Sequence, residues 1–505
     1  METHCLTRLK KTLFLGCIIA LSFQGIAADS SQRKQPFSEV PSSVTQHQIV
    51  IQGKRIDYTA TTGHLTLWNS EGTEWAHFFY VAYTALPSSK SGSRPITFAF
   101  NGGPGSSSIW LHMGALGPKR VAMNDDGSAL PPPFGMVDNE YSWLDKTDLV
   151  FIDPIETGFS RPAEGVKKVE FTGYDEDIRS VGDFIYHYTT QNNRWSDPKY
   201  LAGESYGTTR ATGLSGYLQD RHGMYLNGLI LVSAVLNFQT LYFTEGNDLP
   251  YSLFLPSYAA AAWHHNKIDS AQFGSLSGLL TEAERFASHE YTLALMKGDA
   301  LQPAEFKEVA RQMAALTGLD PEFISNHNLR VSTAAFTKEL LRKEGYTIGR
   351  FDALVKGIDQ KNAGDSYDFD PSYNLTILGT YTAALHAHLS QNLQYQNPKL
   401  TYEVLTSRVR PWNYGPAQNR FLNTSQTLQR AMHKNPHLKV LVCSGYFDLA
   451  TPYFATDYTL NHLFLDPQIK KNIQVQYYLG GHMMYTMKSE LQKFTQDVKA
   501  FYEKN

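Results

Sequence analysis

Cysteine is scarce in this chain: only three of its 505 residues are cysteines. Two of them, Cys5 and Cys17, lie in an N-terminal segment that we expect to be removed. The third, Cys443, then has no partner in the chain with which to form a disulfide. The mature protein must therefore be held together by its hydrophobic core, for which 42% apolar residues supply ample material.

Strong charge, repeats and metal-binding patterns are missing as well. The formal net charge is -3, which gives no sign of the basic surface that nucleic-acid binding requires. The chain shows no internal repeat and no low-complexity segment. Its adjacent histidines, His264 and His265, have no further residue nearby at metal-ligand spacing. We therefore expect no nucleic-acid partner, no metal and no other cofactor.

The first 28 residues have the layout of a secretory signal peptide. A basic stretch, TRLKK, is followed by the apolar run LFLGCIIALSF and by small residues. The apolar run is too short to span a bilayer. We expect cleavage after Ala27 or Ala28, hence an exported protein, periplasmic or secreted, with no membrane insertion once the leader is gone. Cys17 raises a lipoprotein anchor as an alternative, but it lies in the middle of the apolar run.

Length and pattern together predict one large α/β domain with an insertion. Six short apolar runs, each closed by a turn, predict strands of a mostly parallel central sheet flanked by helices. Between the fourth and fifth runs, residues 236–404 carry helical patterns instead. We therefore expect a core over residues 45–235 and 405–505, with a helical cap over 236–404. The six runs are PITFAF (95–100), DLVFI (148–152), YLAG (200–203), LNGLILVS (226–233), LKVLVCSG (438–445) and IQVQYYLGGH (473–482).

One hydroxyl stands between two glycines in the stretch LAGESYGTTRA, residues 201–211. Ser205 has Gly203 two places before it and Gly207 two places after it. Glycines permit a tight turn and close approach of neighbouring backbone. A Gly-x-Ser-x-Gly turn from a strand into a helix leaves the serine oxygen exposed at the tip of the bend. A predicted strand precedes Ser205 and a helical pattern follows it, so we expect Ser205 to be a nucleophile.

Two further residues complete the pattern of a serine hydrolase. A serine hydroxyl is a weak nucleophile and needs a base that is held by a third group. Asp448 follows the fifth of these runs, and His482 is the last residue of the sixth. The order Ser…Asp…His is the one found in α/β-hydrolases. We expect His482 to be the general base and Asp448 to fix its tautomer.

A glycine-rich loop, FNGGPGSSS over residues 100–108, follows the first of these strands. Backbone N–H groups in such a loop can point at the negative charge that develops on a carbonyl oxygen under attack. Its place after a strand and before the nucleophile predicts an oxyanion-binding loop.

Four of these segments resemble the signatures of the serine carboxypeptidase family, in its bacterial form without disulfides. They are Asn-Gly-Gly-Pro-Gly at 101–105, Gly-Glu-Ser-Tyr-Gly at 203–207, Gly-Tyr-Phe-Asp at 445–448 and Gly-Gly-His-Met at 480–483, with TGFS at 157–160 also fitting. The resemblance runs from about residue 60 to residue 500. It implies an α/β-hydrolase fold with a helical insertion, and removal of amino acids from the free C-terminus of peptide substrates.

The resemblance also implies a role for individual residues around the triad of Ser205, Asp448 and His482. The N–H groups of Gly103 and Tyr206 would form the oxyanion hole. Asn101, Glu204 and the Gly102 N–H would hold the terminal carboxylate of the substrate. Glu204 can do so only when protonated, because two carboxylates repel unless they share a proton. We therefore expect catalysis to favour acidic pH.

The chain departs from the family at a few positions. Better-known members carry a second glutamate fourteen places after the loop asparagine, where this chain has Ala115. Ser106 stands where a cysteine is expected, and Glu156 where a glycine is expected. Without the second acid, another group is expected to assist Glu204, and His112 and Arg120 are nearby in sequence.

The sequence thus predicts a serine-type carboxypeptidase that works through an acyl-enzyme. An esterase or acyltransferase that uses the same triad is the alternative, and it differs in whether the site demands a free carboxylate. A non-catalytic binding protein on this scaffold is a third possibility, which an intact triad disfavours. The sequence does not indicate side-chain specificity, oligomeric state or propeptide processing.

Overall fold

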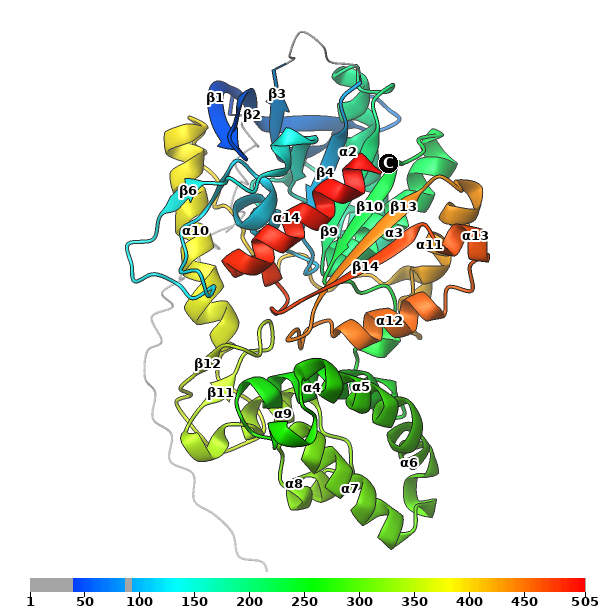
Figure 1. Ribbon diagram of the computed structural model, residues 1–505. Coiled ribbons are helices and arrows are strands. Elements are labelled where there is room, and N and C mark those ends of the chain that lie inside the picture. Colours follow the sequence, from blue (N-terminus) through cyan, green and yellow to red (C-terminus); the bar gives the residue numbers. More distant parts are fainter. Residues whose placement is uncertain (1–39, 87–92, 505) are drawn as a thin grey trace, which may run out of the picture. The chain divides into compact units, whose positions relative to one another are not determined.

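The computed structural model describes residues 40–86 and 93–504 (Figure 1). The predicted leader over residues 1–28 lies outside this part of the chain. Within it, ten strands form one sheet. Strand β8 (Arg161–Pro162) pairs with β3 and lies off the main strand order. The other nine follow the spatial order β1 (Ser43–Ile51), β2 (Lys54–Trp68), β3 (Glu74–Ala85), β7 (Asp148–Ile152), β4 (Ile96–Phe100), β9 (Lys199–Glu204), β10 (Gly228–Val232), β13 (Lys439–Gly445) and β14 (Ile473–Tyr478).

The prediction of a mostly parallel sheet is confirmed. From β7 to β14, every pair of neighbouring strands is parallel, whereas β1, β2 and β3 form an antiparallel extension. All six apolar runs singled out in the sequence are strands of the parallel part. Strands β4, β7, β9 and β10 are buried at every residue, which explains their continuous apolar character.

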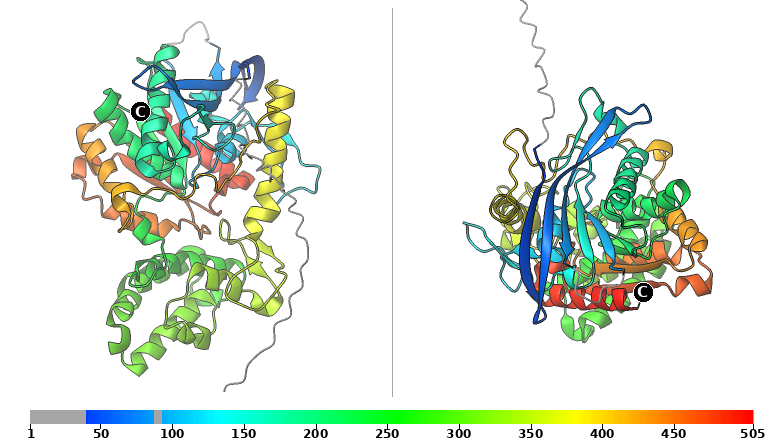
Figure 2. Two further views of the ribbon diagram at one scale, coloured as in Figure 1. Left: turned by 180° about the vertical axis from the view of Figure 1, so that it is seen from behind. Right: turned by 90° about the horizontal axis from the view of Figure 1, so that it is seen from above.

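Helices cover both faces of the sheet (Figure 2). Alternate side chains of a strand point to opposite faces. Leu201 of β9 accordingly shares a hydrophobic cluster with α3. The ring of its neighbour Tyr200 makes an edge-to-face contact with Phe501 of α14. None of the helices in the described ranges is long and apolar enough to cross a membrane. The flanking helices are α2 (Tyr174–Gln191), α3 (Tyr206–His222) and α11 (Ser425–Lys434) on one face, and α10 (Leu378–Ala387) and α14 (Lys488–Glu503) on the other.

Most buried apolar residues of 236–404 belong to two hydrophobic clusters. Residues 249–353, which we call the cap, have a cluster of their own that also includes Phe447, Leu449 and Tyr453 from the core. By contrast, α10 packs into the cluster on the sheet through Tyr381 and Leu385. The helices of residues 249–353 thus pack around a cluster of their own, whereas α10 covers the sheet. The helices of the cap are α4 (Leu249–His264), α5 (Leu276–Phe286), α6 (Thr292–Lys297), α7 (Pro303–Thr317), α8 (Pro321–Asn326) and α9 (Thr333–Glu339).

Short elements complete the described chain. They include the two-stranded pairs β5 (Lys119–Val121) with β6 (Met136–Asp138) and β11 (Thr347–Ile348) with β12 (Lys356–Gly357), together with α1 (Ile109–Leu111), the π-helix η1 (His112–Leu116), α12 (Tyr453–Asn461), α13 (Pro467–Lys470) and the 3-10 helix η12 (Met484–Thr486).

A chain of buried hydrogen bonds fixes η1 to the sheet. Tyr83 OH lies 2.6 Å from His112 Nε2 and 2.7 Å from His388 Nε2. His388 Nδ1 lies 3.0 Å from Asn392 Oδ1. Every bond is satisfied when His388 is protonated on Nδ1 and His112 on Nε2, which makes both imidazoles neutral. Burial lowers the pKa of His112 well below its usual value and lowers the pKa of His388 to about 4.

Acid is therefore expected to destabilise the fold. An unfolded histidine gains its proton near pH 6.5, whereas folded His388 stays neutral down to about pH 4. Between these values the unfolded chain binds more protons, so the free energy of unfolding falls as the pH drops. The pKa difference of His388 alone lowers the free energy of unfolding by about 3 kcal/mol at acidic pH. Urea unfolding at neutral and acidic pH measures this loss, and His388→Gln should reduce it; an equal loss in the variant would contradict the account.

Candidate active site

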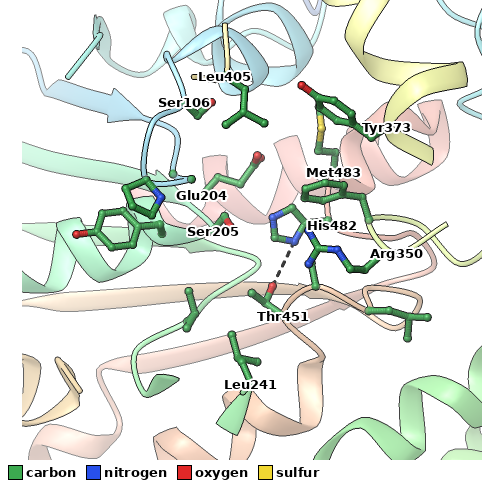
Figure 3. A pocket seen from close by; sticks show the side chains of 18 of the residues that line it. Ser106, Glu204, Ser205, Leu241, Arg350, Tyr373, Leu405, Thr451, His482 and Met483 are labelled. Atoms are coloured by element: carbon green, nitrogen blue, oxygen red, sulfur yellow. Dashed lines mark hydrogen bonds between the residues drawn. The ribbon is translucent and has the colours of Figure 1, made fainter. Parts of the chain in front are cut away.

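The residues singled out in the sequence follow neighbouring parallel strands at one edge of the sheet. Asn101 follows β4, Ser205 follows β9, Asp448 follows β13 and His482 follows β14. The carboxyl ends of parallel strands meet at the same edge, which is where open α/β sheets bind ligands. A pocket of about 640 Å³ opens there, and Ser205 and His482 line it together with Gly102, Gly103 and Glu204 (Figure 3).

Ser205 occupies a sharp turn between β9 and α3. Its φ of 59° and ψ of -129° lie in a region that residues with a side chain rarely adopt. The Ser205 carbonyl accepts a hydrogen bond of 2.8 Å from Thr208 N, which closes the turn into the helix. This is the backbone conformation that exposes a nucleophile at the end of a strand.

The two glycines around Ser205 are required by close backbone contacts. A Cβ atom on Gly203 would lie 2.2 Å from the Gly207 carbonyl oxygen. A Cβ atom on Gly207 would lie 2.8 Å from the Phe100 carbonyl oxygen at the end of β4. Only residues without a side chain fit at these two positions, because β9, α3 and β4 approach each other at the turn.

His482 and Asp448 form a buried pair beside Ser205. His482 Nδ1 lies 2.8 Å from Asp448 Oδ2, and the two side chains are 3% and 0% exposed. Asp448 Oδ1 accepts hydrogen bonds from Ala450 N at 2.7 Å and Thr451 N at 2.9 Å. Donation from His482 Nδ1 leaves Nε2 unprotonated and able to accept a proton. Figure 3 shows the His482 ring beside Ser205, with a dashed line to Thr451.

Two residues that the sequence analysis did not single out hold this pair. Thr451 Oγ1 lies 2.8 Å from Asp448 Oδ2 and 3.2 Å from His482 Nδ1. Ser233, which follows β10, donates a hydrogen bond of 2.6 Å to the His482 carbonyl. Neither belongs to a motif, and only the folded arrangement of the strand ends reveals their contacts.

The glycine-rich loop after β4 packs directly on the turn that carries Ser205. A Cβ atom on Gly102 would lie 2.4 Å from Tyr206 N. Gly103 has a φ of +104°, a conformation that favours glycine. Tyr206 is the first residue of α3, and the first N–H groups of a helix have no partner within the helix. The loop that carries Gly102 and Gly103 therefore packs against the Tyr206 N–H, next to Ser205.

A buried ion pair anchors this loop from behind. Arg210 of α3 is 1% exposed and donates to Asp177 Oδ2 at 2.8 Å. It also donates to the Asn101 carbonyl at 2.6 Å. Arg210 could not be predicted from the sequence, because neither its spacing nor its neighbours distinguish it from a surface residue of α3.

Glu204 is a buried carboxyl beside the nucleophile, with both oxygens held by donors. Asn101 Nδ2 donates to Oε1 at 2.9 Å, and Tyr485 OH donates to Oε2 at 2.5 Å. Asn101 is itself held through Oδ1, which accepts from Leu111 N at 3.1 Å. Burial raises the pKa of Glu204 to about 7, although His482 and the two hydrogen bonds oppose this rise.

The two groups named for their closeness in sequence form no hydrogen bond with Glu204 in the described structure. His112 is buried in its contacts with Tyr83, and Arg120 lies 3.4 Å from Glu140. Neither is among the residues that line the pocket. Ala115 is fully buried, and its methyl group can neither donate nor accept a hydrogen bond.

The two other departures from the family pattern lie near the loop. Ser106 lines the pocket, and its Oγ accepts a hydrogen bond of 2.8 Å from Trp110 Nε1. Glu156 has a φ of 73° and forms an ion pair of 2.6 Å with Arg408. Across residues 40–86 and 93–504, no three His, Cys, Asp or Glu side chains gather closely enough to hold a metal ion.

Comparison with curated proteins gives partial matches to carboxypeptidases. The pheromone-processing carboxypeptidase Kex1 of Saccharomyces cerevisiae is 35% identical over 138 residues, which are 25% of this chain and 17% of that protein. Serine carboxypeptidase-like 46 of Arabidopsis thaliana is 24% identical over 258 residues, 46% of this chain and 51% of that protein. The chain thus matches about half or less of the length of these relatives.

Comparison with solved structures and with family models extends the likeness to most of the chain. The crystal structure of Kex1, a prohormone-processing carboxypeptidase from Saccharomyces cerevisiae, superposes with a TM-score of 0.52 at 16% identity, covering 87% of this chain and 92% of that chain. The two proteins share the α/β-hydrolase fold, as expected from the strand order. The family model of serine carboxypeptidases matches residues 51–499. The chain therefore belongs to the serine carboxypeptidase family.

Proposed function

We propose that this protein is a serine carboxypeptidase that removes amino acids from the free C-terminus of peptides. Ser205 Oγ attacks the last peptide carbonyl while His482 takes its proton, and Asp448 stabilises the imidazolium. The N–H groups of Gly103 and Tyr206 bind the oxyanion. The amine of the terminal amino acid leaves with the proton from His482, and water then hydrolyses the acyl-enzyme ester to restore Ser205.

One observation carries the choice of a carboxypeptidase over another hydrolase. Glu204 is buried next to Ser205, lines the pocket and has a pKa raised to about 7. In its protonated form it can donate a hydrogen bond to a carboxylate of the substrate. We assign the terminal carboxylate to Glu204 and the Gly102 N–H, with Asn101 orienting Glu204. A hydrolase that acts on esters or internal peptide bonds does not need a group that binds a free terminal carboxylate.

The proposal predicts a specific pH dependence. Protonated Glu204 binds the substrate carboxylate, and ionised Glu204 repels it, so binding is lost as the pH rises through about 7. We expect kcat/KM for a blocked dipeptide with a free C-terminus to fall about tenfold per pH unit above that value. Activity should therefore extend to near-neutral pH. Glu204→Gln should abolish the decline, because its amide donates at every pH.

Two control substrates complete this test. The same dipeptide with an amidated C-terminus should resist cleavage, and a simple ester should be hydrolysed without the decline above neutral pH. A decline that persists in Glu204→Gln would overturn the assignment of Glu204. Hydrolysis of esters alone, with both dipeptides untouched, would favour the esterase or acyltransferase alternative.

We further propose that the protein is exported, to the periplasm or beyond, because residues 1–28 have the three-part layout of a signal peptide.

A further inference from the structure

Tyr485 contacts Glu204 from outside the substrate pocket. It lies in η12, three residues after His482, and is 1% exposed. It does not line the 640 Å³ pocket; it lines a separate cavity of about 50 Å³, together with Gly114, Arg120 and Tyr381. A substrate in the pocket therefore meets Glu204 and not Tyr485.

The position of the Tyr485 ring is fixed by packing. A Cβ atom on Gly114 would lie 2.4 Å from Tyr485 Cε2, so the ring fills the space that a side chain on η1 would need. On its other side the ring stacks on Phe494 of α14, with 6.2 Å between the ring centroids. The hydroxyl is thus held at Glu204 Oε2, where it donates its hydrogen bond.

A donor in this position acts on one ionisation state of Glu204 more than on the other. Hydrogen bonds to a carboxylate favour its ionised form, whereas burial favours the neutral form. Four titratable groups face Glu204: His482, Asp448, Tyr485 and Tyr381. His482 and Tyr485 favour the ionised form, and Asp448 opposes it. Of the two tyrosines, Tyr485 is the one hydrogen-bonded to Glu204 in the described structure.

We propose that Tyr485 is the positioning residue that sets the upper pH limit of terminal-carboxylate recognition by Glu204. Its hydroxyl opposes the effect of burial, so Glu204 releases its proton at a lower pH than burial alone would allow. Together with Asn101, it also holds the carboxyl in one orientation when a substrate arrives. This inference rests on the proposed function, in which protonated Glu204 binds the substrate carboxylate.

The test compares Tyr485→Phe with Tyr381→Phe as a matched control. Each variant removes the hydroxyl of a fully buried tyrosine that lines the same small cavity. Tyr485→Phe removes the donor. The pH at which kcat/KM for the free-carboxylate dipeptide begins to decline should therefore rise by about one unit. In Tyr381→Phe this decline should stay where it is in the wild type, and ester hydrolysis should keep its pH profile in both variants.

A uniform loss of activity at all pH values, with the decline unmoved, would show that Tyr485 is only structural and would overturn the inference. In the Glu204→Gln background, Tyr485→Phe should not move the profile, because no carboxyl remains to titrate. Failure of the wild type to cleave the free-carboxylate dipeptide would instead reject the proposed function.

A second measurement covers the case in which Tyr485→Phe folds poorly. A ring-fluorinated tyrosine at position 485 keeps the shape of the side chain but donates a stronger hydrogen bond. The decline should then move to lower pH, opposite to Tyr485→Phe. Binding of the dipeptide to Ser205→Ala, measured by calorimetry across the same pH range, should shift in the same direction as kcat/KM. If the pH profile of kcat/KM does not change in the fluorinated protein, the inference is overturned.

Discussion

Ser205→Ala is expected to lower kcat for the free-carboxylate dipeptide by about 10⁶, because no other group at the turn can form the acyl-enzyme. The strained backbone at Ser205 exposes its oxygen at the end of β9, and His482 beside it is in the tautomer that can accept its proton. Alanine keeps the backbone and removes the oxygen alone. Release of the terminal amino acid, followed by chromatography, measures the loss.

A matched control for this variant is available in the same pocket. Ser106 also lines it, but its hydroxyl contacts Trp110 and the backbone rather than the Asp448–His482 pair. Ser106→Ala should therefore cost less than about tenfold in kcat/KM. A comparable loss in both variants, or more than about one hundredth of the activity remaining in Ser205→Ala, would argue against Ser205 as the nucleophile.

Asp448→Asn is expected to lower kcat by about 10⁴, because the variant selects the wrong tautomer of His482. Asp448 Oδ1 accepts two backbone N–H groups, which will retain the amide oxygen of an asparagine on that side. The amide NH₂ then faces His482 Nδ1 and forces it to become an acceptor. The His482 proton moves to Nε2, which can no longer take a proton from Ser205.

Asp352→Asn provides the control for Asp448→Asn. Asp352 is a partly buried acid near Asp448, and desolvation raises its pKa to about 7. Its Oδ1 accepts a hydrogen bond of 3.0 Å from Leu354 N, and it is not hydrogen-bonded to His482 in the described structure. Its loss should change kcat less than about tenfold. Equal effects of the two variants would contradict the explanation through the tautomer of His482.

The sequence was sufficient to predict the sheet and the convergence of the site, since both depend on local patterns. Apolar runs closed by turns mark the parallel strands, and Ser205, Asp448 and His482 are recognised because each follows such a run. The packing of α10 on the sheet was not predictable in this way. An apolar helix shows no sign in its own sequence of whether it covers a sheet or a cap.

The residues that support the site were also beyond the reach of the sequence. Thr451, Ser233 and Arg210 act through contacts between segments that are far apart in the chain. His112 and Arg120 are close to the loop in sequence, but neither lines the pocket. The tyrosine hydroxyl that is hydrogen-bonded to Glu204, that of Tyr485, comes from the segment after the last strand.

The separate hydrophobic cluster of the cap has a consequence for protein engineering. The loops after the strands are crowded by backbone contacts and tolerate few substitutions, whereas Phe254, Thr333 and Arg350 reach the pocket from the cap. Libraries that vary these cap positions can change which substrate side chains the pocket accepts, while Ser205, Asp448 and His482 stay unchanged. These cap positions are thus far along the chain from Ser205, Asp448 and His482, and the two sets of residues can be varied independently.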